Sequence, residues 1–233
     1  MNKAVAVIVA GGEGSRMATE IRKQYLLLSG LPILSRTLRA IAASPEIDAI
    51  FLAVPETDFD YCRSHVIDRI ETDKAIHLVA GGGCRQVSVA NALNAVPANE
   101  GIVLIHDGVR PFVSADHIAE CIRTAALRGA CSLGLPASDT IKEVDTSGDV
   151  AGTLDRRRLW LTQTPQAFDL AAIREGHARA VEKGCVGTDD ASLIEQSGGR
   201  VRMIHGSPWN IKITTPEDLR LAELILECDL FRD

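Results

Sequence analysis

The sequence predicts an α/β fold with an open, mostly parallel, doubly wound sheet and helices on both of its faces. Short β-branched runs alternate with amphipathic helical patterns along most of the 233 residues, and the connections between them are short. The first run, Ala4 to Val9, is apolar at every position, which is typical of a strand buried on both faces. Sheets of this kind bind ligands beyond the carboxyl ends of their strands. We therefore expect the functional site among the glycine and charged clusters that follow the predicted strands.

Strands and helices alternate through the first half of the chain. Pro32 is expected to open a helix that carries one apolar stripe of Leu34, Leu38 and Ile41. Ser114, with the carboxylate of Asp116 in the first turn, is a good N-cap for a helix to about Arg128. Two further helices are expected, one with Phe59, Cys62, Val66 and Ile70 and one over 86–95. The remaining strands are expected at 47–54, 76–79, 101–105 and 130–135.

This alternation breaks between residues 136 and 168, where the pattern predicts a β-hairpin. Its strands are expected at Thr140 to Val144 and Val150 to Leu154, joined by a five-residue turn. A two-stranded hairpin is marginally stable by itself, so we expect it to pack on something else, and a partner subunit is the natural candidate. The chain is thus expected to be a single domain, 1–233, with a protruding arm at 137–160.

The α/β pattern resumes after the hairpin. A helix is expected from Leu170 to Lys183, and strands at 201–205 and 211–213. Thr215 followed by Pro216 and two acidic residues should begin the last helix.

Composition narrows the class of partner. The net charge of -6, from 25 Lys and Arg against 31 Asp and Glu, argues against nucleic acid as the main partner. Aromatic residues make up 4% of the chain, too few for a base-stacking platform. No stretch approaches the roughly 20 apolar residues of a membrane span, so no membrane association is expected. A small anionic ligand is compatible with this balance if a few cations cluster locally.

The six cysteines show no C-x-x-C pair and no zinc-like spacing. An even number permits a secreted disulfide framework. However, Cys121 and Cys228 fall in helical apolar patterns, and a chain of this length does not depend on bridges. We interpret the cysteines as reduced core thiols of a cytoplasmic protein.

The densest chemical signal is the glycine loop after the first strand, with Gly11, Gly12 and Gly14 followed by Arg16 and Lys23. Glycines let backbone N–H groups turn towards a phosphate, and the two cations suit a polyphosphate. The third glycine of the dinucleotide fingerprint is missing, and no G-x-x-x-x-G-K-[ST] motif occurs. The alternative is a plain glycine turn with solvated cations.

Two more clusters follow predicted strands. Gly81, Gly82 and Gly83 permit flat approach of a base or ribose to the backbone, and Ser88 could hydrogen-bond it, although a flexible surface loop is an equal alternative. Asp107 can hold a divalent cation and Arg110 a phosphate, the alternative being a buried Asp–Arg pair that closes the strand.

The second half of the chain holds three weaker candidates. The run Asp155 to Arg158 reads as a solvated charged segment, most clearly at Arg157 and Arg158. The segment Thr188 to Ser192 is typical of a helix N-terminus with acidic residues in its first turn. Lys212 lies on an otherwise apolar predicted strand and faces either water or an anion.

Taken in order, these segments resemble the 2-C-methyl-D-erythritol 4-phosphate cytidylyltransferase family, also called 4-diphosphocytidyl-2-C-methyl-D-erythritol synthases. The resemblance runs from Ala4 to about Leu226. It is carried by residues 11–17 with Lys23-Gln24-Tyr25, by 82–88, 107–111, Thr140, 154–156, 164–166, 188–192 and 210–214. It implies a Rossmann-like nucleotidyltransferase sheet with a β-hairpin dimerisation arm, in an enzyme that joins CTP and 2-C-methyl-D-erythritol 4-phosphate with Mg²⁺ and releases pyrophosphate during non-mevalonate isoprenoid biosynthesis.

The resemblance also implies roles for individual residues. Ala10, Gly11, Gly14, Arg16 and Lys23 would hold the CTP triphosphate, and Gly82 and Ser88 the cytosine and ribose. The polyol phosphate would be surrounded by Asp107, Arg110, Thr140, Arg156, Thr164, Thr188 and Lys212. Arg16, Lys23, Arg156 and Lys212 would be the catalytic cations, and Asp107 is the candidate metal ligand. In the homodimer of this family the arm reaches into the partner, so Thr140 and Arg156 would serve the neighbouring site.

The sequence departs from the family pattern at two places. Arg22 stands where the family usually has proline, and Gly83 and Cys84 stand where an acidic residue can help to read cytosine. Cytosine selection would then rest more on backbone groups. The nearest alternative is a cytidylyltransferase for another polyol phosphate, such as ribitol 5-phosphate. A nicotinamide-dependent oxidoreductase and a nucleotide-binding regulatory protein are the alternatives from other classes.

Overall fold

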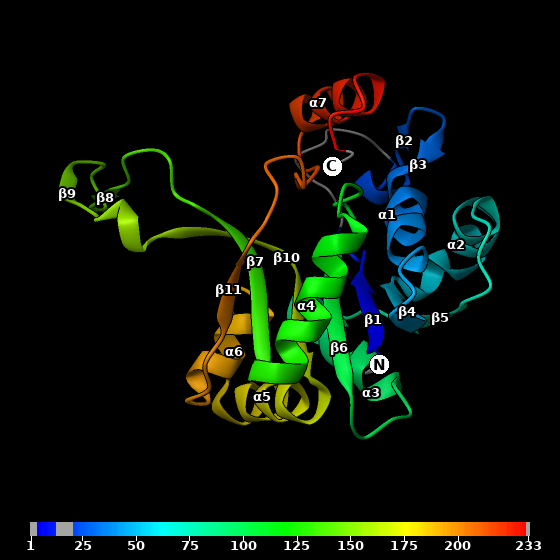
Figure 1. Cartoon of the computed structure of the whole chain (residues 1–233), viewed down its shortest axis with the longest axis horizontal. Helices are drawn as coiled ribbons and strands as arrows, with labels where there is room; N and C mark the ends of the chain where they lie inside the picture. Colours follow the sequence, from blue (N-terminus) through cyan, green and yellow to red (C-terminus); the bar gives the residue numbers. More distant parts are fainter. Residues whose placement is uncertain (1–3, 13–20, 232–233) are drawn as a thin grey trace.

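The computed structural model of the chain describes residues 4–12 and 21–231. Its centre is a seven-stranded sheet within those residues (Figure 1). In sheet order the strands are β11 (Arg202–His205), β7 (Ala130–Pro136), β10 (Trp160–Asp169), β6 (Ile102–Asp107), β1 (Ala4–Val9), β4 (Ile47–Val54) and β5 (Ala75–Ala80). Neighbouring strands are parallel except at β10, which runs antiparallel to both β6 and β7. The expected doubly wound, mostly parallel sheet is confirmed.

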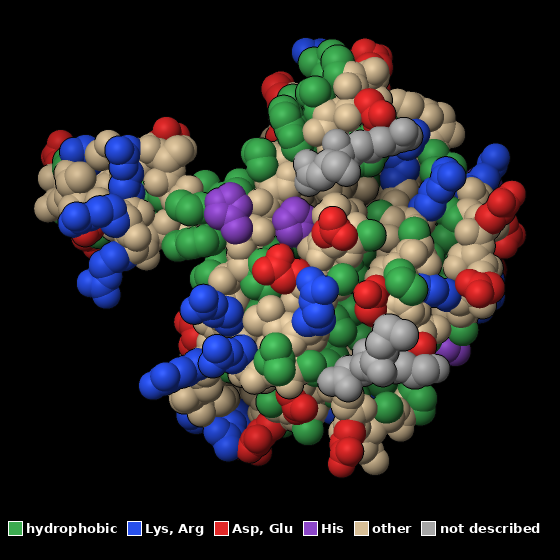
Figure 2. Space-filling view, viewed as in Figure 1, with side chains coloured by type: hydrophobic (Ala, Val, Ile, Leu, Met, Phe, Trp, Pro, Cys, Tyr) green, Lys and Arg blue, Asp and Glu red, His purple; other side chains and the backbone are tan. Residues whose placement is uncertain are grey.

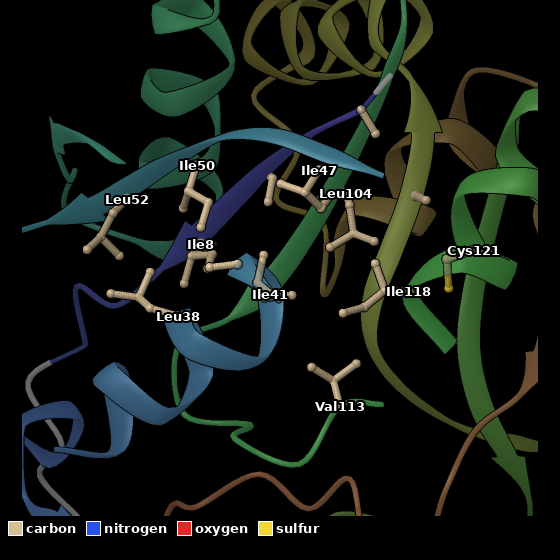
Figure 3. Close-up of a cluster of buried hydrophobic side chains, with 14 of the residues drawn as sticks. Ile8, Leu38, Ile41, Ile47, Ile50, Leu52, Leu104, Val113, Ile118 and Cys121 are labelled. Carbon is tan, nitrogen blue, oxygen red and sulfur yellow. The ribbon is translucent and has the colours of Figure 1, made fainter. Parts of the chain in front are cut away.

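Alternating side chains of the strands build two apolar layers, because successive residues of a strand point to opposite faces. Ile8 of β1 packs on one face and Val7 on the other. The first face is covered by α1 (Ile33–Ala42), α2 (Phe59–His65) and α4 (Ala115–Arg128), and Figure 3 shows this layer. The second face is covered by α3 (Arg85–Ala95), α5 (Leu170–Lys183) and α6 (Asp190–Gln196). Helices on both faces leave the strand ends as the place where polar loops meet.

A third apolar cluster closes the fold near one end of the sheet. It joins α7 (Pro216–Glu227) to the short β2 (Leu27–Leu28), which pairs with β3 (Leu31–Pro32), and to the segment after β6, through Val109 and Phe112. Thr215 begins α7 with a capping box, in which its hydroxyl accepts from Asp218 N–H and the Asp218 carboxylate accepts from Thr215 N–H. The C-terminal helix thus packs beside β2 and the segment that follows β6.

Two predicted elements were wrong. The helix expected to reach Ile70 ends at His65, and a 3₁₀ turn follows at Ile67–Arg69. The Ser35 hydroxyl donates to the Val66 carbonyl (2.9 Å), an acceptor that a continuing helix would have used. Residues 211–213 form no strand; the Ile213 N–H instead bonds the Val109 carbonyl (2.9 Å), and Ile213 packs in the third apolar cluster.

No sequence pattern indicated β10, although it lies between β6 and β7 near the middle of the sheet. Its central residues are polar, with Gln163, Thr164 and Gln166 around a proline, a pattern that does not suggest a buried strand. All three polar side chains are nevertheless buried and hydrogen-bonded.

The expected hairpin is present as β8 (Lys142–Val144) and β9 (Val150–Thr153), closed by the bond from Asp145 N–H to Asp149 O (2.9 Å). It stands away from the body, and Figure 2 shows Lys and Arg side chains on it. Val144 and Val150 on the hairpin are 57% and 60% exposed. In this single chain the arm thus leaves apolar side chains uncovered.

All six cysteines are free. Cys62, Cys121 and Cys131 are buried, but Cys84, Cys185 and Cys228 are exposed, so the expectation of core thiols was wrong for those three. Cys228 directly follows α7, and Cys84 lies in the loop before α3. No helix in the described part of the chain is long and apolar enough to cross a membrane.

Candidate active site

The site lies where the order of strands reverses. After β1 the chain proceeds outwards to β4 and β5 and then returns to β6 on the other side of β1, so the ends of β1 and β6 diverge at a topological switch point. Val9 and Asp107, the last residues of these strands, are paired in register. A cavity of about 710 Å³ opens there, within the usual size of a small-molecule site.

One wall of the cavity is the loop after β1 and the 3₁₀ turn Lys23–Tyr25. The Gln24 amide donates to the Ala10 carbonyl (2.6 Å) and is almost fully buried, which ties the turn to the end of β1. Lys23 lies over Gly12, since a methyl group on that glycine would be 3.9 Å from Lys23 Cε. Arg22, also on the cavity wall, pairs with Asp58 (3.1 Å). Gly14 and Arg16 lie outside the described residues.

The opposite wall is the loop from Gly81 to Cys84. Ser88 fixes its shape: the hydroxyl accepts from Gly82 N–H (3.0 Å) and donates to the Cys84 carbonyl (3.0 Å). A methyl group on Gly82 would collide with the Val87 side chain, so this position requires glycine. The loop is therefore a built surface and not a flexible one.

Asp107 forms the floor and is contacted by three cations. Its Oδ1 accepts from Arg85 Nε (3.1 Å), its Oδ2 accepts from Lys212 Nζ (2.7 Å), and Arg110 Nε lies 3.8 Å from Oδ2. Burial opposes ionisation, but Arg85, Lys212 and Arg110 outweigh it and hold the pKa of Asp107 well below its ordinary value. The predicted Asp107–Arg110 pair exists, although Arg85 and Lys212 approach the carboxylate more closely.

A hydrogen-bonded chain beneath the floor holds the Asp107 backbone. Asp107 N–H donates to Thr164 Oγ1 (3.0 Å), and the Thr164 hydroxyl donates to His106 Nδ1 (3.0 Å). His106 Nε2 then donates to the Arg110 carbonyl (2.9 Å), an arrangement that requires the neutral ring with its proton on Nε2. Burial lowers the pKa of His106 to about 4, so the neutral form persists at neutral pH.

The structure brings together most of the predicted site residues. Those that line the cavity are Ala10, Gly11, Lys23, Gly82, Ser88, Asp107 and Lys212. Arg110 and Thr164 support Asp107 from below. Thr188 is exposed on the loop before α6. Thr140 and Arg156 belong to the arm, where Arg156 donates to the Ser138 carbonyl (2.6 Å), and neither lines this cavity.

The sequence reasoning missed Arg85 as a site residue. It is the first residue of α3, lines the cavity and contacts both Asp107 and, through Nη1, Asp190 (2.7 Å). The available signal was its position two residues after a glycine run and at the start of a helix that follows a strand.

Charge within the cavity is opposite to that of the whole chain. Among the described lining residues, the four cations Arg22, Lys23, Arg85 and Lys212 outnumber the two carboxylates, Glu56 and Asp107, whereas the chain carries a net -6. Glycine loops and local cations at a switch point suit a nucleotide and its phosphates. The fold and the site together define a protein of the nucleotidyltransferase class.

Comparison with known proteins agrees with that class and narrows it. The profile of the family described as IspD, 2-C-methyl-D-erythritol 4-phosphate cytidylyltransferase, matches residues 4–228. A relative of that name from Syntrophotalea carbinolica is 50% identical over 222 residues, which is 95% of each chain. Another from Syntrophus aciditrophicus is 46% identical over 225 residues, covering 97% of this chain and 96% of the relative. The chain belongs to the 2-C-methyl-D-erythritol 4-phosphate cytidylyltransferase family.

A solved structure supports the same fold. The crystal structure of 4-diphosphocytidyl-2C-methyl-D-erythritol synthase from Anaerococcus prevotii superposes with a TM-score of 0.85 at 32% identity. The alignment covers 97% of this chain and 96% of that one.

Proposed function

We propose that this chain joins CTP and 2-C-methyl-D-erythritol 4-phosphate to give 4-diphosphocytidyl-2-C-methyl-D-erythritol and pyrophosphate, a step of non-mevalonate isoprenoid biosynthesis. Family membership supports the substrates. The observation that carries the chemistry is the cavity at the β1–β6 switch point, where two glycine-rich walls face the Asp107–Lys212 pair.

The nucleotide is placed between the two walls. The backbone of Ala10, Gly11 and Gly14, with Arg16 and Lys23, holds the triphosphate, because unobstructed N–H groups and cations are what a polyanion needs. The loop with Gly82 receives cytosine and ribose. Ser88 serves this loop through the hydrogen bonds that shape it, and its hydroxyl lies at the cavity wall.

The acceptor is placed on the Asp107 side. Lys212 attracts its phosphate, and the buried Arg110 adds positive charge from beneath the floor. Asp107 accepts hydrogen bonds from the acceptor's hydroxyl groups, Thr164 holds the Asp107 backbone from below, and Thr188 completes this half. Thr140 of the partner subunit and Arg156 of the partner subunit close it, since in a single chain the arm points away from the body.

The reaction needs no nucleophilic side chain. The acceptor phosphate is largely dianionic at neutral pH, because its second pKa is about 6. One of its oxygens attacks the α-phosphorus of CTP, the bond from that phosphorus to the bridging oxygen of the β-phosphate breaks, and pyrophosphate leaves with the electron pair. The residues of this site hold two mutually repelling anions in line and stabilise the charge that builds at phosphorus. Arg16 and Lys23 do so on the triphosphate, Lys212 and Arg156 on the acceptor.

Mg²⁺ is the expected cofactor. The described residues are compatible with an ion that enters the site bound to the triphosphate. No group of three or more metal-ligating side chains occurs in the part of the chain that the structure describes. Among the residues that the structure describes, Asp107 is the carboxylate on the floor, and both of its oxygens already face cations. Mg²⁺ in nucleotide sites is commonly bound by substrate phosphates and one or two carboxylates, so Asp107 is the residue that would contact it. When bound, the ion neutralises charge on the triphosphate.

The arm supports a homodimer, since a lone hairpin with exposed Val144 and Val150 gains stability by packing on a second body. Sedimentation should give twice the chain mass. A variant lacking residues 140–154 should sediment as a monomer, and a dimer of that variant would remove the arm from the interface.

The free cysteines support a cytoplasmic location, where thiols stay reduced.

The deciding experiment is pyrophosphate release with CTP, Mg²⁺ and either 2-C-methyl-D-erythritol 4-phosphate or ribitol 5-phosphate. Release should require the first acceptor and fall when ATP, GTP or UTP replaces CTP. A preference for ribitol 5-phosphate would reassign the acceptor. No release with any pair, together with binding of CTP, would indicate a regulatory nucleotide-binding protein, and binding of NAD(H) in its place would indicate an oxidoreductase.

A further inference from the structure

A series of charged contacts leads from the partly exposed Lys212 at the active-site floor to buried groups in the layer of α5 and α6. Lys212 Nζ contacts Asp107 Oδ2 (2.7 Å), and Asp107 Oδ1 accepts from Arg85 Nε (3.1 Å). Arg85 Nη1 donates to Asp190 Oδ2 (2.7 Å), and Asp190 Oδ1 faces His177 Nε2 at 3.2 Å. Both carboxylates of this series are therefore held by nitrogen donors on each of their oxygens.

Burial makes these contacts obligatory. The Asp190 side chain is 1% exposed and the His177 side chain 5%. A buried carboxylate without partners is strongly unfavourable, so Asp190 depends on Arg85 and on a His177 ring that carries its proton on Nε2. Burial disfavours the guanidinium charge, but Asp190 and Asp107 outweigh it and raise the pKa of Arg85. Arg85 is thus a permanent cation between two fixed anions.

The Asp190 end of this series of contacts is anchored to the backbone. Asp190 begins α6, and the loop before it is held by Gln166 of β10, whose amide donates to Asp189 (2.7 Å) and accepts from Ala191 N–H (3.0 Å). His177 lies on α5, which packs beside α6. The Asp190 carboxylate therefore has a set position from which to orient Arg85.

We propose that Arg85 is a further positioning residue of this site, held by Asp190 and His177 so that it fixes the Asp107 carboxylate and, through it, the Lys212 ammonium. With Oδ1 occupied by Arg85, Asp107 presents Oδ2 to Lys212 and Arg110. Without Arg85, Oδ1 of Asp107 is free, and the carboxylate can rotate so that Lys212 and Arg110 share both of its oxygens. The Lys212 ammonium would then move away from the position where it meets the acceptor phosphate. A planar guanidinium can bridge two carboxylates in this way, whereas a lysine has one charged point.

The effect on turnover rests on the proposed function, but the positioning itself does not, so it is tested by both spectroscopy and kinetics. The Arg85 Nε–H resonance is assigned in a ¹H–¹⁵N spectrum by its loss in Arg85→Lys. It should move in Asp190→Asn and, less, in His177→Phe. His177→Gln, whose amide can replace Nε2 as a donor, should return it towards the wild-type position. Ile173→Val is the matched control, because Ile173 is fully buried on the same helix, one turn from His177, but belongs to the apolar layer.

Kinetics with saturating CTP should follow the same order. Asp190→Asn should lower kcat/KM for the acceptor by about tenfold, by analogy with residues that orient metal ligands, and mainly through KM. His177→Phe should lower it less. Combined with Asp190→Asn, His177→Phe should add little, because both changes remove the same contact. Ile173→Val should leave kcat and KM unchanged.

Two results would overturn the proposal: an unmoved Arg85 resonance in Asp190→Asn, or an equal change of KM in Ile173→Val. A wild-type enzyme that released no pyrophosphate would contradict the proposed function instead, and the spectra would still test the chain of contacts.

Discussion

Acidification to pH 5 should weaken this fold through His106, a fully buried histidine at the end of β6. Its ring accepts from the Thr164 hydroxyl at Nδ1 and donates to the Arg110 carbonyl from Nε2. A second proton on the ring would turn Nδ1 into a donor and break the bond from Thr164. At pH 5 the native state therefore keeps the ring neutral, whereas the ring in the unfolded state is mostly protonated.

The magnitude follows from the pKa values of the two states, about 4 in the fold against an ordinary 6.5. Well above pH 6.5 both states are neutral and His106 contributes no pH dependence. Below that pH the unfolded chain binds a proton that the native chain does not, so the free energy of unfolding decreases as the pH falls. The decrease is about 2 kcal/mol at pH 5 and about 3 kcal/mol at pH 4.

Urea unfolding at pH 7, 6 and 5 measures this decrease, with His106→Gln as the reference. The variant should be less stable at pH 7, because it loses the ring's contacts, but its loss between pH 7 and pH 5 should be smaller by about 2 kcal/mol. Other titrating groups are common to both proteins and cancel in the difference. Equal losses in the two proteins, or an NMR titration of His106 with a midpoint near 6.5, would refute the reasoning.

Four further outcomes are expected. Gly108→Ala should cost about 1–3 kcal/mol in urea unfolding, because the new methyl group would lie 2.9 Å from the side chain of Ala10; wild-type stability would mean that the loop can shift freely. Thr215→Ala should cost about 1 kcal/mol by losing the α7 cap, whereas Thr215→Ser should not, and equal melting of the two variants would contradict the capping role. Lys23→Ala should lower kcat roughly 100-fold with unchanged melting, and exposed Lys183→Ala serves as its control; near-normal turnover would remove Lys23 from the mechanism. Arg156→Ala should raise KM for the polyol phosphate but not for CTP, and an unchanged KM would return Arg156 to the solvated surface.

Local signals were sufficient for much of the fold. The apolar run of β1 and the Ser114 cap of α4 were predicted at their observed positions, because a cap and a doubly buried strand depend on residues close in sequence. The glycine loops were placed correctly at strand ends for the same reason. The hairpin also followed from local pattern, including its turn.

Features that depend on contacts between residues far apart in the sequence could not be predicted from local patterns. The polar residues of β10 gave no strand signal, since they are buried only because partners from β6, β7 and the loop before α6 satisfy them. Lys212 was predicted on a strand and lies instead on a segment without one, held by Asp107 from more than a hundred residues away. Arg85 was overlooked because neither of its carboxylate partners is near it in sequence.

The sequence by itself determined most of the strands and helices, the hairpin, the glycine-rich walls and the family to which they point. Those features arise from the periodicity of apolar residues and the freedom of glycine, which act over a few residues. Only the tertiary structure decided which charges meet, because a buried ion pair forms between groups that distant elements carry to one place. The neutral His106 beneath the floor and the line of contacts from Lys212 to His177 exist only once the sheet has brought β6, α3, α5 and α6 together.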